Sequence, residues 1–118
     1  SKRASITLEA QGRVWNLRIT TNGMVKYFDV AGEQFIDGLQ KLHEDPNNIA
    51  RMRNLFFAGL AQEHEMTPEM AGDIIDDIGL GEAMALLGQA TELAFPAPNG
   101  SVGNDLSRQK KSSKAPTT

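Results

Sequence analysis

The stretch NNIARMRNLFFAGLAQE, residues 47–63, predicts the helix around which the rest of the chain folds. At about 100° per residue its apolar side chains fall on one broad stripe, which leaves only a narrow polar strip. The stripe consists of Ile49, Met52, Leu55, Phe56, Gly59 and Leu60. Because a helix this apolar is usually buried on most sides, we expect it to be the central helix of the fold.

Two interpretations of Phe57 are open in this helix. Phe56 and Phe57 are adjacent and point about 100° apart, so their rings cannot face the same neighbour. In the interpretation that we favour, the helix packs against other elements on two sides. In the alternative, Phe57 forms with Ala50 and Ala61 an exposed groove that binds an apolar helix of a partner protein.

The segment SITLEAQGRVWNLRIT, residues 5–20, predicts a β-hairpin. Apolar and polar residues alternate on both sides of Gln11 and Gly12, and glycine readily adopts the positive φ that a tight turn needs. Either Val14 or Trp15 continues the inner row of the second strand. Because strict alternation is broken at Trp15, we expect this side chain on the outer face, where another element would have to cover it.

Four further helices are predicted from capping residues, apolar spacing and stop signals, at about residues 20–31, 33–44, 67–79 and 80–95. Their apolar side chains at helical spacing are Met24, Tyr27, Phe28, Phe35, Ile36, Leu39, Leu42, Ala71, Ile74, Ile75, Ile78, Ala83, Leu86, Leu87, Ala90 and Leu93. The sequence therefore predicts an α+β fold, in which an N-terminal hairpin packs on a bundle of four to five short helices. A chain of 118 residues suits one globular domain, which we place at residues 1–96.

The stretch TPEMAGDIIDDIG, residues 67–79, contains three clustered aspartates, Asp73, Asp76 and Asp77. Thr67 as a cap and Pro68 at the first helical position indicate a helix start, and the apolar spacing assigns the aspartates to the solvent side. A calcium loop needs acidic residues at alternate positions of a non-helical segment, and a catalytic pair needs one desolvated carboxyl group. We therefore interpret the cluster as the outward face of an amphipathic helix.

The residue types exclude several kinds of chemistry. The chain has no cysteine, which excludes disulfides, thiolate nucleophiles and cysteine-based metal sites. Its two histidines, His43 and His64, do not form a His-Glu-x-x-His motif, because Pro68 occupies the fourth position after His64. We predict two surface histidines, no catalytic site, no metal and no cofactor, and thus a protein that is not an enzyme.

Charge is divided unevenly along the chain, whose formal net charge is −3. Residues 1–96 hold 8 Lys or Arg and 14 Asp or Glu, giving −6, whereas residues 97–118 hold 4 Lys or Arg and one Asp, giving +3. The cations of this second segment are Arg108, Lys110, Lys111 and Lys114. We predict a disordered basic tail over residues 97–118, since so few apolar residues cannot offset the entropy of ordering. Its charge could contact nucleic acid weakly, but a solubilising role is favoured and nucleic acid is not the expected partner.

No segment of the sequence has the pattern of an export signal or a membrane span. The N-terminal residues SKRASITLEA are charged and then alternate, unlike a signal peptide. The densest apolar run, LFFAGLA at residues 55–61, is far shorter than the roughly 18 residues that indicate a membrane helix. We therefore expect a cytoplasmic protein without membrane contact.

Three stretches of the sequence together resemble one family. They are TLEAQGRVWNLRITTNGM at residues 7–24, RNLFFAGLAQEHEMTPEMAGDIIDDIG at residues 53–79, and the last predicted helix before the polar tail. They resemble the small tail proteins of gene transfer agents and related siphophages, a family that includes tail assembly chaperones. The resemblance covers about residues 5–95. Members of the family often have paired acids in the first helix, where this chain has Phe28 and Asp29.

The resemblance implies a role in tail morphogenesis. A tail assembly chaperone keeps the long apolar tape-measure protein soluble and helps tail tube subunits polymerise around it, so both proteins are implied partners. Self-association into a homo-oligomer is compatible with this role. The alternative within the same family is a structural tail component, such as a tail tube or minor tail protein, that stays in the particle. A nucleic-acid-binding regulator acting through the basic tail is the rival outside the family.

Overall fold

The computed structural model describes residues 5–63 and 65–96, and within them it has the predicted α+β fold. The antiparallel hairpin of β1 (Ile6–Ala10) and β2 (Arg13–Leu17) precedes five helices. These are α1 (Thr21–Ala31), α2 (Phe35–Glu44), α3 (Ile49–Gly59), α4 (Pro68–Ile78) and α5 (Leu80–Ala94). The predicted disordered tail at residues 97–118 lies outside the described residues.

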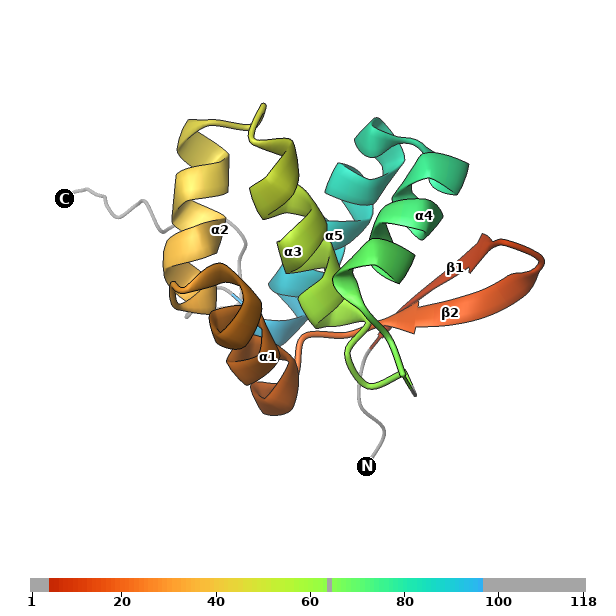
Figure 1. Cartoon of the computed structure of the whole chain (residues 1–118), viewed down its shortest axis with the longest axis horizontal. Coiled ribbons are helices and arrows are strands. Elements are labelled where there is room, and N and C mark those ends of the chain that lie inside the picture. Colours follow the sequence, from red (N-terminus) through yellow and green to blue (C-terminus); the bar gives the residue numbers. More distant parts are fainter. Residues whose placement is uncertain (1–4, 64, 97–118) are drawn as a thin grey trace, which may run out of the picture.

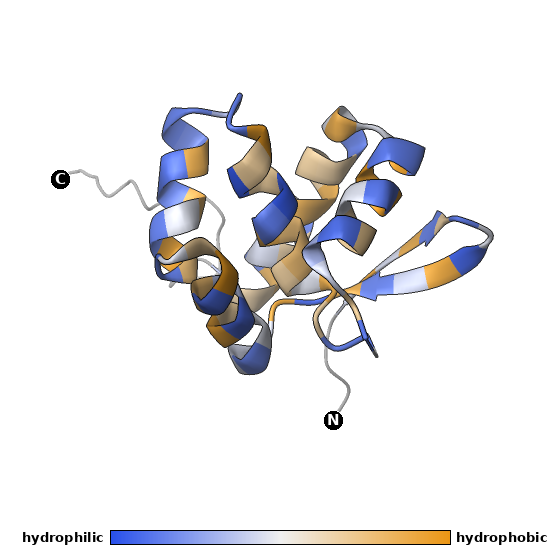
Figure 2. Ribbon diagram, in the orientation of Figure 1, coloured by the Kyte–Doolittle hydropathy of each residue, from blue (hydrophilic) through white to orange (hydrophobic). Residues whose placement is uncertain are grey.

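Helix α3 is central, as its apolar composition predicts. It contacts each of the other four helices, with α1 and α2 on one side in Figure 1 and α4 on the other. Both strands and all five helices contribute to one hydrophobic core. Figure 2 shows hydrophobic and hydrophilic bands alternating along α2 and α4, as expected of helices with one buried face.

The hairpin turn is formed by Gln11 and Gly12, which have φ values of 55° and 75°. Two successive residues with positive φ are the signature of the tight turn that suits the twist of a hairpin. The backbone N–H of Gln11 donates a hydrogen bond to Oδ2 of Asp77 at 2.7 Å. One aspartate of the predicted outward cluster thus fastens the turn of the hairpin to α4.

The prediction that Trp15 lies on the outer face of the hairpin is wrong. Trp15 lies opposite Leu8 in the hairpin and is buried, whereas the preceding residue, Val14, is exposed. Strict alternation continues through Trp15, and Val14 is an apolar residue on the solvent side. The Trp15 Nε1–H donates to the carbonyl of Ala10 at 2.9 Å, and the Arg13 guanidinium lies 3.8 Å from the indole ring centre. The buried ring therefore has a partner for its only polar group.

Three of the helices begin at residues whose side chains cap them. Thr20 caps α1 through its Oγ1, which accepts from the N–H of Gly23 at 2.9 Å, and Asn48 caps α3 by accepting from the N–H of Arg51 at 3.0 Å. Thr67 caps α4, with Pro68 in the first turn. In each case the side-chain oxygen satisfies an N–H that the helix itself leaves free.

Three helices differ from the prediction in detail. The predicted central helix continues to about residue 63, but α3 ends at Gly59, and Leu60 has a non-helical backbone that begins a turn. Ile36 and Leu93 are predicted to be buried, but both side chains are exposed. The core-facing side chains of α2 are Phe35, Leu42 and the half-buried Leu39, and Ile36 points about 100° away from Phe35.

Candidate partner-binding groove

The groove predicted around Phe57 is not present on the surface. Phe57 is 4% exposed, and Ala61 is also buried, whereas Ala50 is exposed at the start of α3. The physical reason is that α3 packs on two sides, so a side chain 100° away from Phe56 still points into the core. Of the two interpretations of Phe57, the exposed groove is therefore wrong.

The histidine and the aspartates that the structure describes lie on the surface, as the sequence predicts. His43 and the aspartates Asp73, Asp76 and Asp77 are exposed, and Ile74 and Ile75 on the opposite face of α4 are buried. Within residues 5–63 and 65–96, no group of three or more potential ligands could hold a metal ion. The other predicted histidine and the tail contacts lie outside the described residues; they are His64, Arg108, Lys110, Lys111 and Lys114.

A groove of about 380 Å³ does exist on the surface, between α3 and α4, and we call it the α3/α4 groove. Its apolar lining combines the buried side chains of Met52 and Ile75 with two exposed ones, Ile49 and Leu80. Ile49 is 53% exposed and Leu80 is 47% exposed. These two residues begin α3 and α5, so the ends of different helices bring their side chains to the same groove.

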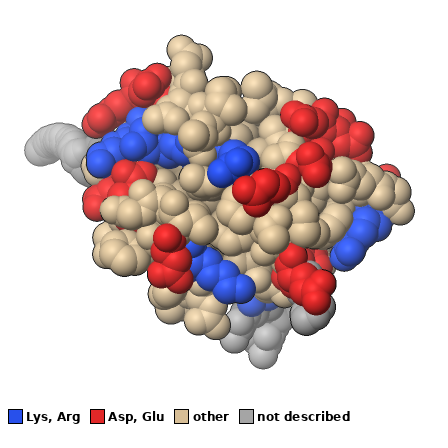
Figure 3. Space-filling view, viewed as in Figure 1, with Lys and Arg blue, Asp and Glu red and all other residues tan. Residues whose placement is uncertain are grey.

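The rim of the α3/α4 groove is acidic. Three exposed carboxylate residues of α4 line it, Glu69, Asp73 and Asp76, together with one cation, Arg53. The formal charge of the lining is thus three negative charges and one positive charge, or −2. Figure 3 shows acidic side chains gathered over α4. Apolar side chains surrounded by carboxylates are suited to a ligand that is apolar on one face and basic at its flanks.

Gly72 gives the groove its shape. A Cβ at this position would lie 3.3 Å from Cδ of Arg53, so the absence of a side chain leaves room for the arginine stem against α4. The Arg53 guanidinium donates to Oδ1 of the neighbouring Asn54 from Nε at 3.2 Å and from Nη2 at 3.0 Å. Arg53 is thereby held along α3 at the edge of the groove.

The most perturbed titratable groups form a separate network where α1, α2 and α3 meet. Glu33 accepts from the Tyr27 hydroxyl at 2.5 Å, from Arg51 Nε at 2.9 Å and from Lys41 Nζ at 3.2 Å. The hydrogen bond from Arg51, followed by that from Tyr27, lowers the pKa of Glu33 to about 2. Burial, followed by the hydrogen bond to Glu33, raises the pKa of Tyr27. The carboxylate therefore joins three helices, which is a structural task.

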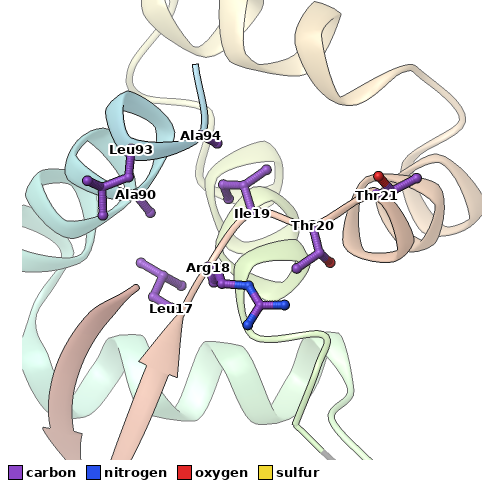
Figure 4. A pocket seen from close by; sticks show the side chains of 8 residues that line it. All are labelled: Leu17, Arg18, Ile19, Thr20, Thr21, Ala90, Leu93 and Ala94. Atoms are coloured by element: carbon purple, nitrogen blue, oxygen red, sulfur yellow. The ribbon is translucent and has the colours of Figure 1, made fainter. Parts of the chain in front are cut away.

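A second surface groove of about 450 Å³ lies between residues 17–21 and the end of α5 (Figure 4). Leu93 and Ala90 of α5 lie across from Ile19, and Arg18 supplies the one charged group among its lining residues. Because this lining holds no carboxylate, it lacks the alternation of apolar and acidic groups that marks the α3/α4 groove. We therefore take the α3/α4 groove as the candidate binding site.

Comparison of the chain with protein families, with curated proteins and with solved structures finds no match. The resemblance to small tail proteins therefore stays a prediction. Within the described residues, no helix combines the length and the apolar character needed to cross a membrane.

Proposed function

We propose that this chain is a tail assembly chaperone of a phage, a prophage or a gene transfer agent, and that it binds apolar helical segments of the tape-measure protein. The observation that carries the proposal is the α3/α4 groove, where the apolar side chains of Ile49 and Leu80 are exposed among carboxylates. These carboxylates belong to a part of the chain, residues 1–96, that is acidic as a whole. The resemblance of three sequence stretches to small tail proteins supplies the class of partner. The role needs binding surface and no catalytic group.

The dimensions of the groove suit one face of a helix. Its volume of about 380 Å³ lies near the lower end of the range for ligand sites, roughly 300–1,000 Å³. Such a space accepts a row of side chains rather than a whole helix. An amphipathic helix supplies that row at positions i, i+3 or i+4, and i+7. Met52 and Ile75 would contact the deepest of these side chains.

The acidic rim adds selectivity to this apolar contact. Carboxylates of Glu69, Asp73 and Asp76 favour helices that carry Lys or Arg beside their apolar row and disfavour acidic ones. Such surface charges chiefly accelerate association, and salt screens them. The proposal therefore includes a partner segment with basic flanks and an association rate that falls as salt is added.

Mass spectrometry of assembly intermediates and finished tails tests the proposed role. A chaperone co-purifies with the tape-measure protein before assembly and is absent from finished tails. If the chain instead occurs in finished tails in stoichiometric amounts, the chaperone proposal is wrong and the structural alternative is supported.

The structural alternative has an observation in its favour. Helix α1 exposes three large apolar side chains, Val25, Phe28 and Val30, which a neighbouring subunit in a tail would cover. We place this alternative second, because the exposed charged residues beside them on α1, Lys26 and Asp29, are of opposite sign and favour no particular partner.

A further inference from the structure

We infer that the basic segment at residues 106–114 of this same chain occupies the α3/α4 groove when no partner is bound. The segment would then act as an internal competitor that an arriving helix must displace. As a statement about regulation, the inference rests on the proposed function, which makes the groove the partner site. The contact itself requires no partner and is measured without one.

Charge complementarity is the first reason. The lining of the groove has a formal charge of −2, from Glu69, Asp73, Asp76 and Arg53. Residues 106–114, LSRQKKSSK, contain four cations and no acidic residue. Opposite charges on two parts of one chain attract each other within about a Debye length, roughly 10 Å at 0.1 M salt.

An apolar anchor is the second reason. Leu106 stands two residues before Arg108, so an apolar side chain leads directly into the basic run. The groove offers the matching arrangement, since Ile49 and Leu80 are exposed next to the carboxylates. Burying a leucine side chain there removes apolar surface from water, which favours the contact, and the entropy of ordering the segment opposes it.

Reach is the third reason. The described chain ends at Pro96, just after α5, and Leu80 at the opposite end of α5 lines the groove. The 15 residues of α5 span about 22 Å, at about 1.5 Å per residue. The ten residues from 97 to 106 span up to about 33 Å when extended. Leu106 can therefore reach the groove, and a short tether gives an effective concentration on the order of millimolar, so a weak contact suffices.

Paramagnetic broadening in the full-length chain tests the contact. Because the chain has no cysteine, Ser112→Cys provides a single attachment point for a nitroxide label. We expect the amide signals of Gly72, Asp73 and Asp76 to broaden at low salt and to recover at about 0.5 M salt, where screening is strong. Broadening that is spread evenly over the molecule, or that is centred on another face, would overturn the inference.

A pair of charge-reversal variants separates the groove from general attraction to an acidic body. Asp73→Lys with Asp76→Lys changes the groove, and Asp29→Lys with Glu44→Lys changes the charge by the same amount on α1 and α2. The first variant should abolish the broadening at Gly72 and the second should preserve it. Equal loss in both variants, or no loss in the first, would contradict the inference.

The same label also separates this inference from the proposed function. Broadening at the groove without any binding of tape-measure protein would support the tail contact and contradict the chaperone role. Binding of tape-measure protein without broadening at the groove would support the chaperone role and contradict the tail contact. If both are correct, adding the tape-measure segment should restore the signal of Gly72.

Discussion

Phe57 is one of the large side chains of the hydrophobic core. It is buried in the two-sided packing of α3, whereas Phe28 on α1 is 45% exposed. We predict that Phe57→Ala lowers the free energy of unfolding by about 3–5 kcal/mol, because a buried ring leaves a cavity. Phe28→Ala is the matched control and should cost well under half as much. Urea denaturation of both variants measures this, and equal losses would contradict the packing described for α3.

Glu33 makes stability depend on pH in the acid range. Its pKa is about 2 in the folded protein, below the ordinary 4.5, so the unfolded chain binds the proton more readily. The contribution of Glu33 is therefore complete above about pH 4.5 and is lost as the pH falls towards 2. Glu33→Gln should cost on the order of 1–3 kcal/mol at pH 7, because hydrogen bonds to a charged group are lost.

The measurement is the free energy of unfolding of the wild type and Glu33→Gln at pH 7 and pH 2.5. The difference between the two proteins should shrink at the lower pH, where the unfolded wild-type carboxyl is protonated. A difference that is equally large at both values would show that the carboxylate charge is not what stabilises the junction with Arg51 and Tyr27.

At the scale of elements, the crossing of α1 over α3 depends on Gly23. A Cβ at this position would lie 2.4 Å from the backbone carbonyl oxygen of Ala58, and a carbonyl cannot rotate away as a side chain can. We predict that Gly23→Ala destabilises the fold by about 1–3 kcal/mol through overpacking. Gly88→Ala is the control, because Gly88 lies in α5 with no atom within 4 Å of the added Cβ.

The control should stabilise the protein by about 0.5–1 kcal/mol, since alanine favours a helix interior over glycine. Thermal unfolding of both variants distinguishes the two effects. If Gly23→Ala is as stable as Gly88→Ala, the close approach of the two helices is not present in solution.

The order of strands and helices can be predicted from the sequence because the features that set it act over a few residues. The cap at Thr67 and the turn at Gln11 and Gly12 act over a few residues, and the structure confirms them. The prediction for Trp15 is wrong for a local reason. The residue before it, Val14, is apolar but exposed, so the alternation of buried and exposed residues cannot be recognised from residue type.

The candidate site was harder to predict because it depends on contacts between distant segments. The sequence assigned Ile49 to the buried stripe of the central helix, whereas the structure leaves it exposed beside Leu80 and the carboxylates of α4. The Glu33 junction includes a hydrogen bond from Arg51, which lies 18 positions away in the chain. A pattern within one helix shows which residues are apolar, but the neighbouring elements decide which of them stay exposed.

At the scale of the whole molecule, the proposed function requires that apolar surface be presented without a loss of solubility. The α3/α4 groove meets this requirement by surrounding a few exposed apolar side chains with carboxylates, on a body whose residues 1–96 have a formal charge of −6. The basic residues 106–114 of the same chain would cover the groove until a partner arrives. Binding, solubility and regulation are thereby assigned to one surface.

The affinity of the chain for a tape-measure protein of phage tails tests whether the α3/α4 groove is the partner site. The groove variant is Ile49→Ser with Leu80→Ser, at residues 53% and 47% exposed. The control is Ile36→Ser with Leu93→Ser, at residues 50% and 45% exposed. Each variant replaces one isoleucine in the first turn of a helix and one leucine of α5, and adds no charge. We predict that the groove variant weakens binding at least about tenfold and that the control stays within about twofold of the wild type. If the groove variant binds as tightly as the wild type, the α3/α4 groove is not the partner site.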